Sequence, residues 1–165
     1  MTVLSAPADL ASVALRPVGT EDEAFLLALY ISVRAPEFAA AGWDAAQLNA
    51  FLGGQYRLQA HHYTTYYDTS RFAVVSVGGE AAGRLYVDYG GEDIRIVDIS
   101  LLPPWRGRGI GAALLTTVLD EARAAGRPVS LHVADDNPAL GLYERLGFRL
   151  TGERNGPYSH MLWTD

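Results

Sequence analysis

Apolar positions in the first part of the chain predict one strand followed by two helices. Residues 13–18 alternate closely enough for a strand. Thr20, with a glutamate three residues later, has the pattern of a capping box, and the apolar spacing behind it predicts a helix over residues 24–33. Asp44 is suited to cap a second helix, whose apolar positions continue towards Tyr67.

The next segments have the alternation of strands. Residues 71–77 and 81–89 flank Gly78 and Gly79, and two glycines between such runs predict a β-hairpin. Residues 94–102 carry apolar side chains on both faces, which favours a central strand. Strict alternation divides this strand into one face with Ile94, Ile96, Asp98 and Ser100 and another with Val97, Ile99 and Leu101.

The remainder of the chain predicts two further helices and three strands. The strongest helical pattern begins at Gly109 and ends at Gly126. A buried strand over residues 128–133 and a short helix from Asn137 to Leu146 follow, and residues 148–152 and 158–163 complete the sheet. This order predicts an α/β (α+β) fold, with one mixed sheet of about six or seven strands flanked by about four helices.

Composition restricts the functions open to this chain. Its 165 residues fit one domain, 1–165, with residues 1–12 as a flexible arm. Hydrophobic residues make up 49% and charged residues 19%, which is typical of a globular protein. The net charge of −6 argues against nucleic acid as the main partner. No stretch approaches the roughly 20 apolar residues of a membrane span, so we expect a cytoplasmic protein with no membrane attachment.

The residue types that are missing exclude several chemistries. All 13 cationic residues are arginines, so no lysine is present to form a Schiff base or a P-loop. Cysteine is also absent, which excludes disulfides, thiolate zinc sites and cysteine nucleophiles. The four histidines show no metal-ligand spacing, and we predict no metal site.

A glycine-rich turn before the strongest helix is the main candidate for binding chemistry. Glycines expose backbone N–H groups without obstruction by Cβ atoms, and a helix N-terminus adds free donors and partial positive charge. Arg106 and Arg108 add full charges whose forked donors suit phosphate. A diphosphate is therefore the predicted ligand. The alternative is a turn that only lets strand and helix pack closely.

Two other phosphate-binding motifs do not fit the turn. A Walker A loop requires the lysine that this chain lacks. The dinucleotide fingerprint matches Gly107, Gly109 and Ala112, but it also needs an acidic residue about 20 positions later. No acid occurs in residues 125–131, and only one further strand–helix unit follows. We therefore reject a dinucleotide site.

Two motifs resemble the GNAT superfamily of N-acetyltransferases. Arg106-x-x-Gly109-x-Gly111 resembles its Arg/Gln-x-x-Gly-x-Gly/Ala signature, between a strand and a long helix. The segment from Asn137 to Leu142-Tyr143-x-x-x-Gly147-Phe148 resembles the second signature. The likeness is close from residue 94 to 148 and follows element order elsewhere. It implies a mostly antiparallel GNAT-like sheet, acetyl-CoA as cofactor, and possible homodimers through C-terminal strands.

The resemblance also implies roles for individual residues. The N–H groups around residues 108–112 would bind the coenzyme A pyrophosphate, and the strand edge at 99–101 would pair with the pantetheine arm. Tyr143 would protonate the leaving thiolate. The family usually places Asn seven residues before this Tyr, whereas Asn137 lies six before it and Asp136 seven. The implied cofactor set is Ile99, Ser100, Leu101, Arg106, Gly107, Arg108, Gly109, Ile110, Gly111, Ala112, Asn137 and Tyr143.

Transfer of an acetyl group to an amine also needs a group that takes a proton. His132 lies on the strand after the long helix, where some relatives, such as the ribosomal-protein alanine acetyltransferases, carry a glutamate. Asp98 could instead attract the ammonium or relay its proton. For both residues, a structural role is the alternative.

The acceptor is predicted to bind between the first two helices and the C-terminal strands. An aromatic-rich pocket there suits an apolar or cationic amine. The candidates are Arg34, Glu37, Trp43, Tyr56, Tyr63, Tyr66, Tyr67, Tyr158 and His160. Together these features predict an N-acetyltransferase that acts on a small molecule or a peptide N-terminus. A non-catalytic acyl-CoA-binding module and a purely structural domain are the alternatives.

Overall fold

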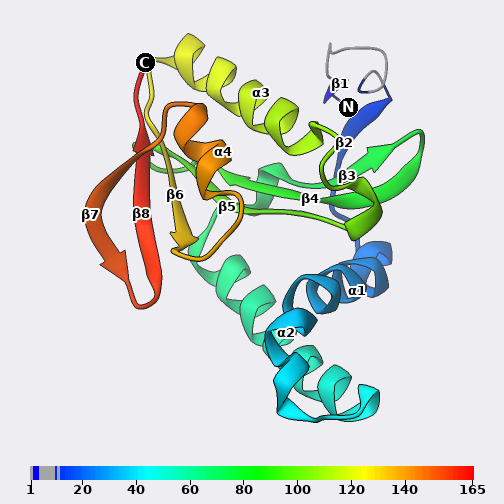
Figure 1. Ribbon diagram of the computed structural model, residues 1–165. Coiled ribbons are helices and arrows are strands. Elements are labelled where there is room, and N and C mark those ends of the chain that lie inside the picture. Colours follow the sequence, from blue (N-terminus) through cyan, green and yellow to red (C-terminus); the bar gives the residue numbers. More distant parts are fainter. Residues whose placement is uncertain (1, 4–9, 11) are drawn as a thin grey trace.

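The computed structural model describes residues 2–3, 10 and 12–165. Its eight strands form one sheet in the order β1-β2-β3-β4-β5-β6-β8-β7 (Figure 1). All neighbouring strands are antiparallel except β5 and β6. The strands are β1 (Thr2–Val3), β2 (Val13–Pro17), β3 (Phe72–Val77), β4 (Glu80–Asp88), β5 (Ile94–Leu101), β6 (Val129–Ala134), β7 (Arg149–Asn155) and β8 (Tyr158–Trp163). The predicted mixed, mostly antiparallel sheet is confirmed, and the two-residue β1 brings the described strands to eight.

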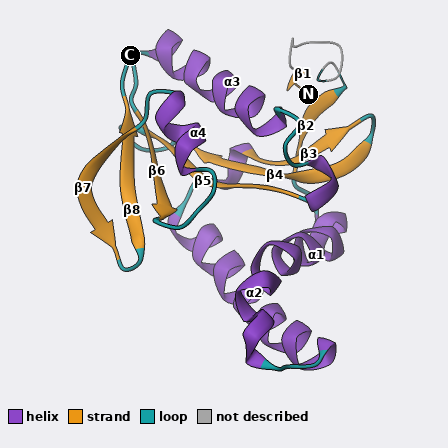
Figure 2. Cartoon of the chain, viewed as in Figure 1, coloured by secondary structure: helices purple, strands orange, loops and turns teal. Residues whose placement is uncertain are grey.

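Helices cover both faces of this sheet (Figure 2). One face is covered by α3 (Ile110–Ala125) and the short α4 (Leu140–Arg145), which share the main hydrophobic core with β3 to β6 and β8. The other face is covered by α1 (Glu23–Arg34) and α2 (Ala45–Tyr66), whose own cluster includes Tyr30 and Tyr56. The four predicted helices are therefore confirmed, but the short one begins at Leu140 and not at the predicted Asn137, because residues 137–139 form a turn.

Local sequence explains where several elements begin and end. Gly78 and Gly79 have φ angles of 59° and 85°, which the tight β3–β4 turn requires and which glycine adopts without strain. Asp44 and Gln47 form the capping box of α2. Gly126, at φ 64°, ends α3 in the left-handed conformation. These predicted signals are confirmed.

The division of β5 into two faces differs from the prediction. A register shift between β4 and β5 leaves Val97 without a paired partner, as in a β-bulge. Because one extra residue reverses the alternation, Ile96 and Ile99 both pack into the core under α3. Asp98 and Ser100 therefore lie on the α1–α2 face together with Arg95, not with Ile94 and Ile96. The strict alternation assumed from the sequence was wrong at this point.

The parallel strands β5 and β6 pair over only part of their length. Their register joins Ile94 to Val129 and Ile96 to Leu131 and goes no further. Since β5 continues to Leu101, the strands separate beyond this point, and α4 lies over the opening (Figure 1). The β5 edge that faces the opening carries backbone N–H and C=O groups with no sheet partner on that side among the described residues.

Two features of the first forty residues differ from expectation. Thr20 does not cap α1: it lies in the 3₁₀ turn η1 (Thr20–Asp22), and the Asp22 carboxylate accepts from the Gly19 N–H at 2.8 Å. Within the predicted arm 1–12, Thr2 and Val3 pair with β2 as β1, and residues 1, 4–9 and 11 lie outside the described part.

One stretch also has the length and composition of a membrane-crossing helix, contrary to the sequence analysis. This stretch, Thr20–Ala41, includes η1, α1 and the 3₁₀ segment η2 (Ala35–Ala41). Within the described residues only 17% of its apolar window is buried, and the buried part includes Leu26 and Tyr30 of α1, which pack against α2. By length and composition alone it is weak support for a membrane span.

Candidate active site

The glycine-rich turn presents an open set of backbone donors at the start of α3. Gly107 and Gly109 have φ angles of 69° and 80°, which turn the chain sharply into the helix. A Cβ atom added at Gly107 or Gly111 would meet nothing within 4 Å. The first intrahelical bond of α3 runs from Ala113 N–H to Gly109 C=O at 3.0 Å, and no side chain caps the helix. The preceding N–H groups have no hydrogen-bond partner among the described residues and are therefore available to an anion.

Both arginines of the turn are anchored without losing all their donors. Arg106 donates its Nε–H to the carbonyl of Leu101 at 2.8 Å, which ties the turn to the end of β5. The Arg108 guanidinium lies 5.1 Å from the ring centre of Trp105, a cation–π contact. Both side chains are exposed. Trp105 was not singled out from the sequence, although it is the aromatic residue nearest to the two arginines in the motif.

Tyr143 lies on α4 and belongs to the main hydrophobic core on the α3–α4 face of the sheet. Only 6% of the residue is exposed, and its ring packs edge-on against Phe148 at 5.9 Å. Burial, together with the nearby charge of Asp98, raises the pKa of Tyr143 to about 12. Its hydroxyl makes no hydrogen bond to another described residue. The phenol therefore stays protonated at neutral pH and has a proton to donate.

Asp98 belongs to a buried polar network on the α1–α2 face. Its carboxylate pairs with Arg84 at 2.7 Å and accepts hydrogen bonds from the hydroxyls of Tyr63, at 3.0 Å, and Ser100, at 2.7 Å. Arg84 also donates to Gln59 at 2.8 Å, while its buried Nε–H has no partner among the described residues. Three donors hold the Asp98 side chain in one position beneath the strand opening.

The contribution of Tyr63 to this network can be measured. Tyr63→Phe removes one hydrogen bond to a charged acceptor, and we expect the free energy of unfolding to fall by about 1.5–3 kcal/mol. Denaturant unfolding followed by circular dichroism measures the change. Tyr66→Phe on the same helix is the matched control, because Tyr66 is 70% exposed, and we expect a change within about 0.5 kcal/mol. An equal loss in both variants would contradict the assignment.

His132 lies on the same face as Asp98, on β6. Its Nδ1 contacts the guanidinium of Arg95, and its ring lies 5.1 Å from that of His160 on β8. Burial lowers the pKa of His132, and the charges of Arg95 and His160 act in the same direction. The imidazole is therefore neutral at pH 7. Because Arg95 can only donate, Nδ1 is the acceptor and Nε2 carries the proton.

The predicted acceptor residues fall into separate groups. Arg34 and Glu37 form an ion pair at 3.0 Å, and Arg34 also donates to the Tyr30 hydroxyl at 3.1 Å, whereas Tyr158 lies half-exposed on β8. Trp43 instead stacks on Phe38 at 5.7 Å and contacts Phe51, at the far end of α2 from Tyr63.

Two other predicted residues are also engaged in local contacts. The Tyr56 hydroxyl donates to Glu23 at 3.2 Å, and Tyr56 is buried between α1 and α2, so it does not line an open acceptor pocket. Asn137 is exposed, and its Oδ1 accepts from the Ala139 N–H at 2.8 Å, which stabilises the turn that leads into α4. Its side-chain amide N–H groups make no hydrogen bond to another described residue. Asp136 is also exposed and lies in the same turn.

Arg84 and Gln59 were not identified from the sequence. Arg84 is a charged residue within an otherwise largely apolar strand, and only 3% of it is exposed. An isolated charge at a buried strand position requires a partner, and this signal could have identified the network. No group of three or more potential metal ligands occurs among the described residues.

Comparison with known proteins identifies the family. Residues 40–148, well over half of the chain, match the acetyltransferase (GNAT) family. The chain belongs to the GNAT family. The resemblance seen in the two motifs is thereby confirmed, and at the level of the family so is the predicted cofactor, since its members use acetyl-CoA.

Solved structures of GNAT acetyltransferases share the fold. The PaiA N-acetyltransferase of Thermoplasma acidophilum, solved in complex with coenzyme A, is 16% identical, with a TM-score of 0.69 over 93% of this chain and 99% of that one. Naa50 of Arabidopsis thaliana, in complex with the bisubstrate analogue CoA-Ac-MVNAL, is 19% identical, with a TM-score of 0.59 over 92% and 97%. The ribosomal-protein-S18-alanine N-acetyltransferase of Escherichia coli is 19% identical, with a TM-score of 0.60 over 92% and 93%.

Proposed function

We propose that this GNAT protein transfers an acetyl group from acetyl-CoA directly to a primary amine. The acceptor is a small molecule or the N-terminus of a peptide. Two sets of backbone groups without a partner among the described residues carry the proposal. One is the N–H groups at the start of α3, and the other is the edge of β5 that faces the opening between β5 and β6. We place the enzyme in the cytoplasm.

The chain's own groups suit each part of the donor. The free N–H groups from Ile110 to Ala112 and the guanidinium groups of Arg106 and Arg108 would hold the diphosphate. The free edge of residues 99–101 would pair with the amide groups of the pantetheine arm, as a neighbouring strand does. Asn137 has side-chain donors that face solvent near the same opening.

Acetyl-CoA supplies the acetyl group as a thioester, and the amine attacks it with release of a thiol. A backbone N–H of the free β5 edge would polarise the carbonyl oxygen. Tyr143 would donate its phenolic proton to the departing sulfur, since burial keeps the phenol protonated. No covalent enzyme intermediate is needed, which agrees with the absence of cysteine.

Of the two candidates for the amine's proton, the contacts favour Asp98. Arg84 and Tyr63 both donate to its Oδ2, whereas Oδ1 accepts only from Ser100 and has capacity for a further donor. The acceptor nitrogen of His132 is already engaged by Arg95. We therefore propose that the Asp98 carboxylate attracts the ammonium form of the acceptor and that the ammonium proton passes to water. His132 and Arg95 would line the side of the site where the acceptor binds. Arg34, Glu37, Tyr158 and His160 would border the acceptor.

Acetyl-CoA binding and turnover test the proposal separately. Because a ligand that binds only the folded state stabilises it, we expect millimolar acetyl-CoA to raise the Tm by several degrees. A screen of primary amines and peptide N-termini in a thiol-release assay should then identify an acceptor. Binding without thiol release for any amine would support a non-catalytic acyl-CoA-binding module. An unchanged Tm would contradict both readings.

A further inference from the structure

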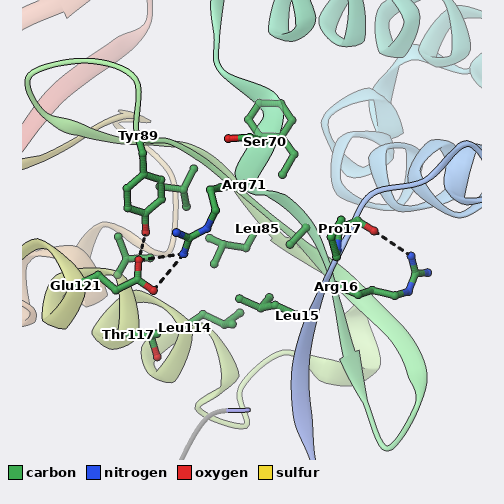
Figure 3. A pocket seen from close by; sticks show the side chains of 14 residues that line it. Leu15, Arg16, Pro17, Ser70, Arg71, Leu85, Tyr89, Leu114, Thr117 and Glu121 are labelled. Carbon is green, nitrogen blue, oxygen red and sulfur yellow. Dashed lines mark hydrogen bonds and ion pairs between the residues drawn. The ribbon is translucent and has the colours of Figure 1, made fainter. Parts of the chain in front are cut away.

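A second cavity lies between α3 and the sheet, away from the proposed acetyl-transfer site. Its volume is about 180 Å³, it is partly open to solvent, and residues of β2, β3, β4 and α3 line it (Figure 3). None of the residues assigned to the acetyl donor, Asp98 or Tyr143 lines it. The lining residues are Leu15, Arg16, Pro17, Ser70, Arg71, Phe72, Ala73, Leu85, Val87, Tyr89, Leu114, Thr117, Val118 and Glu121.

One end of this cavity is apolar. Leu15 of β2, Leu85 of β4 and Leu114 of α3 converge there, and Ala73 and Val118 complete the wall (Figure 3). A cavity of roughly 150 Å³ with walls of this kind can hold benzene. The volume and lining therefore suit one aromatic ring or a branched aliphatic group.

The opposite end carries polar groups, and only some of their hydrogen-bond donors have partners. The Nη2 of Arg71 donates to both carboxylate oxygens of Glu121, at 3.1 and 3.0 Å, and the Tyr89 hydroxyl donates to the same carboxylate at 2.5 Å. The Arg71 Nε–H and Nη1–H groups have no partner among the described residues, and half of the side chain is exposed. The hydrogen-bonding groups that remain available at this end are therefore N–H donors of the positively charged Arg71.

The charged side chains of the lining are already paired. Arg71 pairs with Glu121, which offsets its charge, so only the remaining N–H donors of its guanidinium are left for a ligand. Arg16 is committed to Asp22 at 2.6 Å, which leaves Arg71 as the group able to receive a ligand. A forked guanidinium with free donors binds a carboxylate well.

We propose that this cavity binds a small carboxylate with an apolar body of about the size of benzoate. The ring would lie among Leu15, Leu85 and Leu114, and the carboxylate would accept from the free donors of Arg71. The proposal goes beyond acetyl transfer and does not depend on it. Because Leu114 and Val118 belong to α3, a bound carboxylate would rest on the helix whose N-terminus forms the glycine turn.

Calorimetric titration of the full chain with benzoate tests the proposal. Benzyl alcohol and benzyltrimethylammonium serve as neutral and cationic counterparts, and neither can be acetylated at nitrogen. We expect saturable benzoate binding with a roughly millimolar Kd, at least tenfold tighter than either counterpart. Saturating coenzyme A should not compete, whether or not it binds. Equal affinity for benzyl alcohol, or competition by coenzyme A, would overturn the assignment.

Two variants and one control locate the site. Arg71→Gln removes the cation at the exposed end, and we expect benzoate affinity to fall at least tenfold. Arg123→Gln is the matched control, since Arg123 is also half exposed and lies on α3 outside the cavity, and we expect unchanged affinity. Ala73→Leu fills the apolar end and should also abolish binding. Benzoate binding that survives both Arg71→Gln and Ala73→Leu would place the ligand elsewhere and overturn the proposal.

Discussion

Gly109→Glu is expected to abolish acetyl-CoA binding at concentrations that saturate the wild-type protein. The substitution places a carboxylate where the free N–H groups of α3 are proposed to meet a diphosphate, and like charges repel. It also forces a non-glycine residue to adopt φ near 80°. We expect the affinity to fall at least about a hundredfold, which corresponds to roughly 2.7 kcal/mol. Calorimetry and the Tm shift measure the loss.

The chain offers a close control for this substitution. Gly79 has φ 85°, lies exposed in the β3–β4 turn, and has open space around a Cβ atom. Gly79→Glu therefore introduces the same side chain at a similar backbone strain, in a turn that is not part of the proposed diphosphate site. We expect it to cost about 1–2 kcal/mol of stability and to leave acetyl-CoA affinity unchanged. Retained binding by Gly109→Glu, or equal losses in both variants, would show that the diphosphate binds elsewhere.

Local patterns predicted the elements because their signals lie within a few residues of each element. The side chains of Asp44 and Gln47 each accept from the backbone N–H of the other residue at the start of α2, and Gly78 and Gly79 supply the turn between β3 and β4. The face assignment of β5 failed because the bulge at Val97 arises from pairing with β4. No property of residues 94–102 taken alone specifies where their partner strand shifts register.

The candidate site shows the same division between local and long-range information. The turn from Arg106 to Gly111 is continuous in sequence, so its open donors could be predicted from spacing. The network around Asp98 joins residues 35 and 14 positions away, Tyr63 and Arg84, which meet only when α2 packs on the sheet. The contact between Arg95 and His132 likewise spans 37 positions. From the sequence alone, His132 was therefore a candidate base, because its contact with Arg95 could not be predicted.

The position of Tyr143 connects the two parts of the site. Its helix, α4, lies over the opening where β5 and β6 separate, so its phenol comes from the core face while Asp98 comes from the α1–α2 face. Burial first, and the charge of Asp98 second, raise the pKa of the Tyr143 phenol to about 12. The bulge at Val97 matters here, because it turns Asp98 away from the core face that holds Ile96. An acid and an acceptor of protons can thus approach one reacting centre from opposite faces of the sheet.

Tyr143→Phe is expected to lower kcat about a hundredfold or more, with little change in acetyl-CoA affinity. The variant keeps the buried ring against Phe148 and removes only the proton donor. Steady-state thiol release measures kcat, and calorimetry measures affinity. Tyr56→Phe is the matched control: Tyr56 is also buried and its pKa is also raised to about 12, but it lies between α1 and α2. We expect that control to lose about 1 kcal/mol of stability and no more than about twofold in kcat.

The pH profile gives a second test of the same role. Burial raises the pKa of Tyr143 to about 12, so its phenol stays protonated as the pH rises from 7 to about 10. Since the acid remains available and the amine becomes increasingly neutral, kcat/KM should rise over this range and show no alkaline decline. Tyr143→Phe should keep the shape of the profile at a lower rate. If the variant turned over at the wild-type rate at every pH, another group would have to supply the proton, and Tyr143 would be a core residue only.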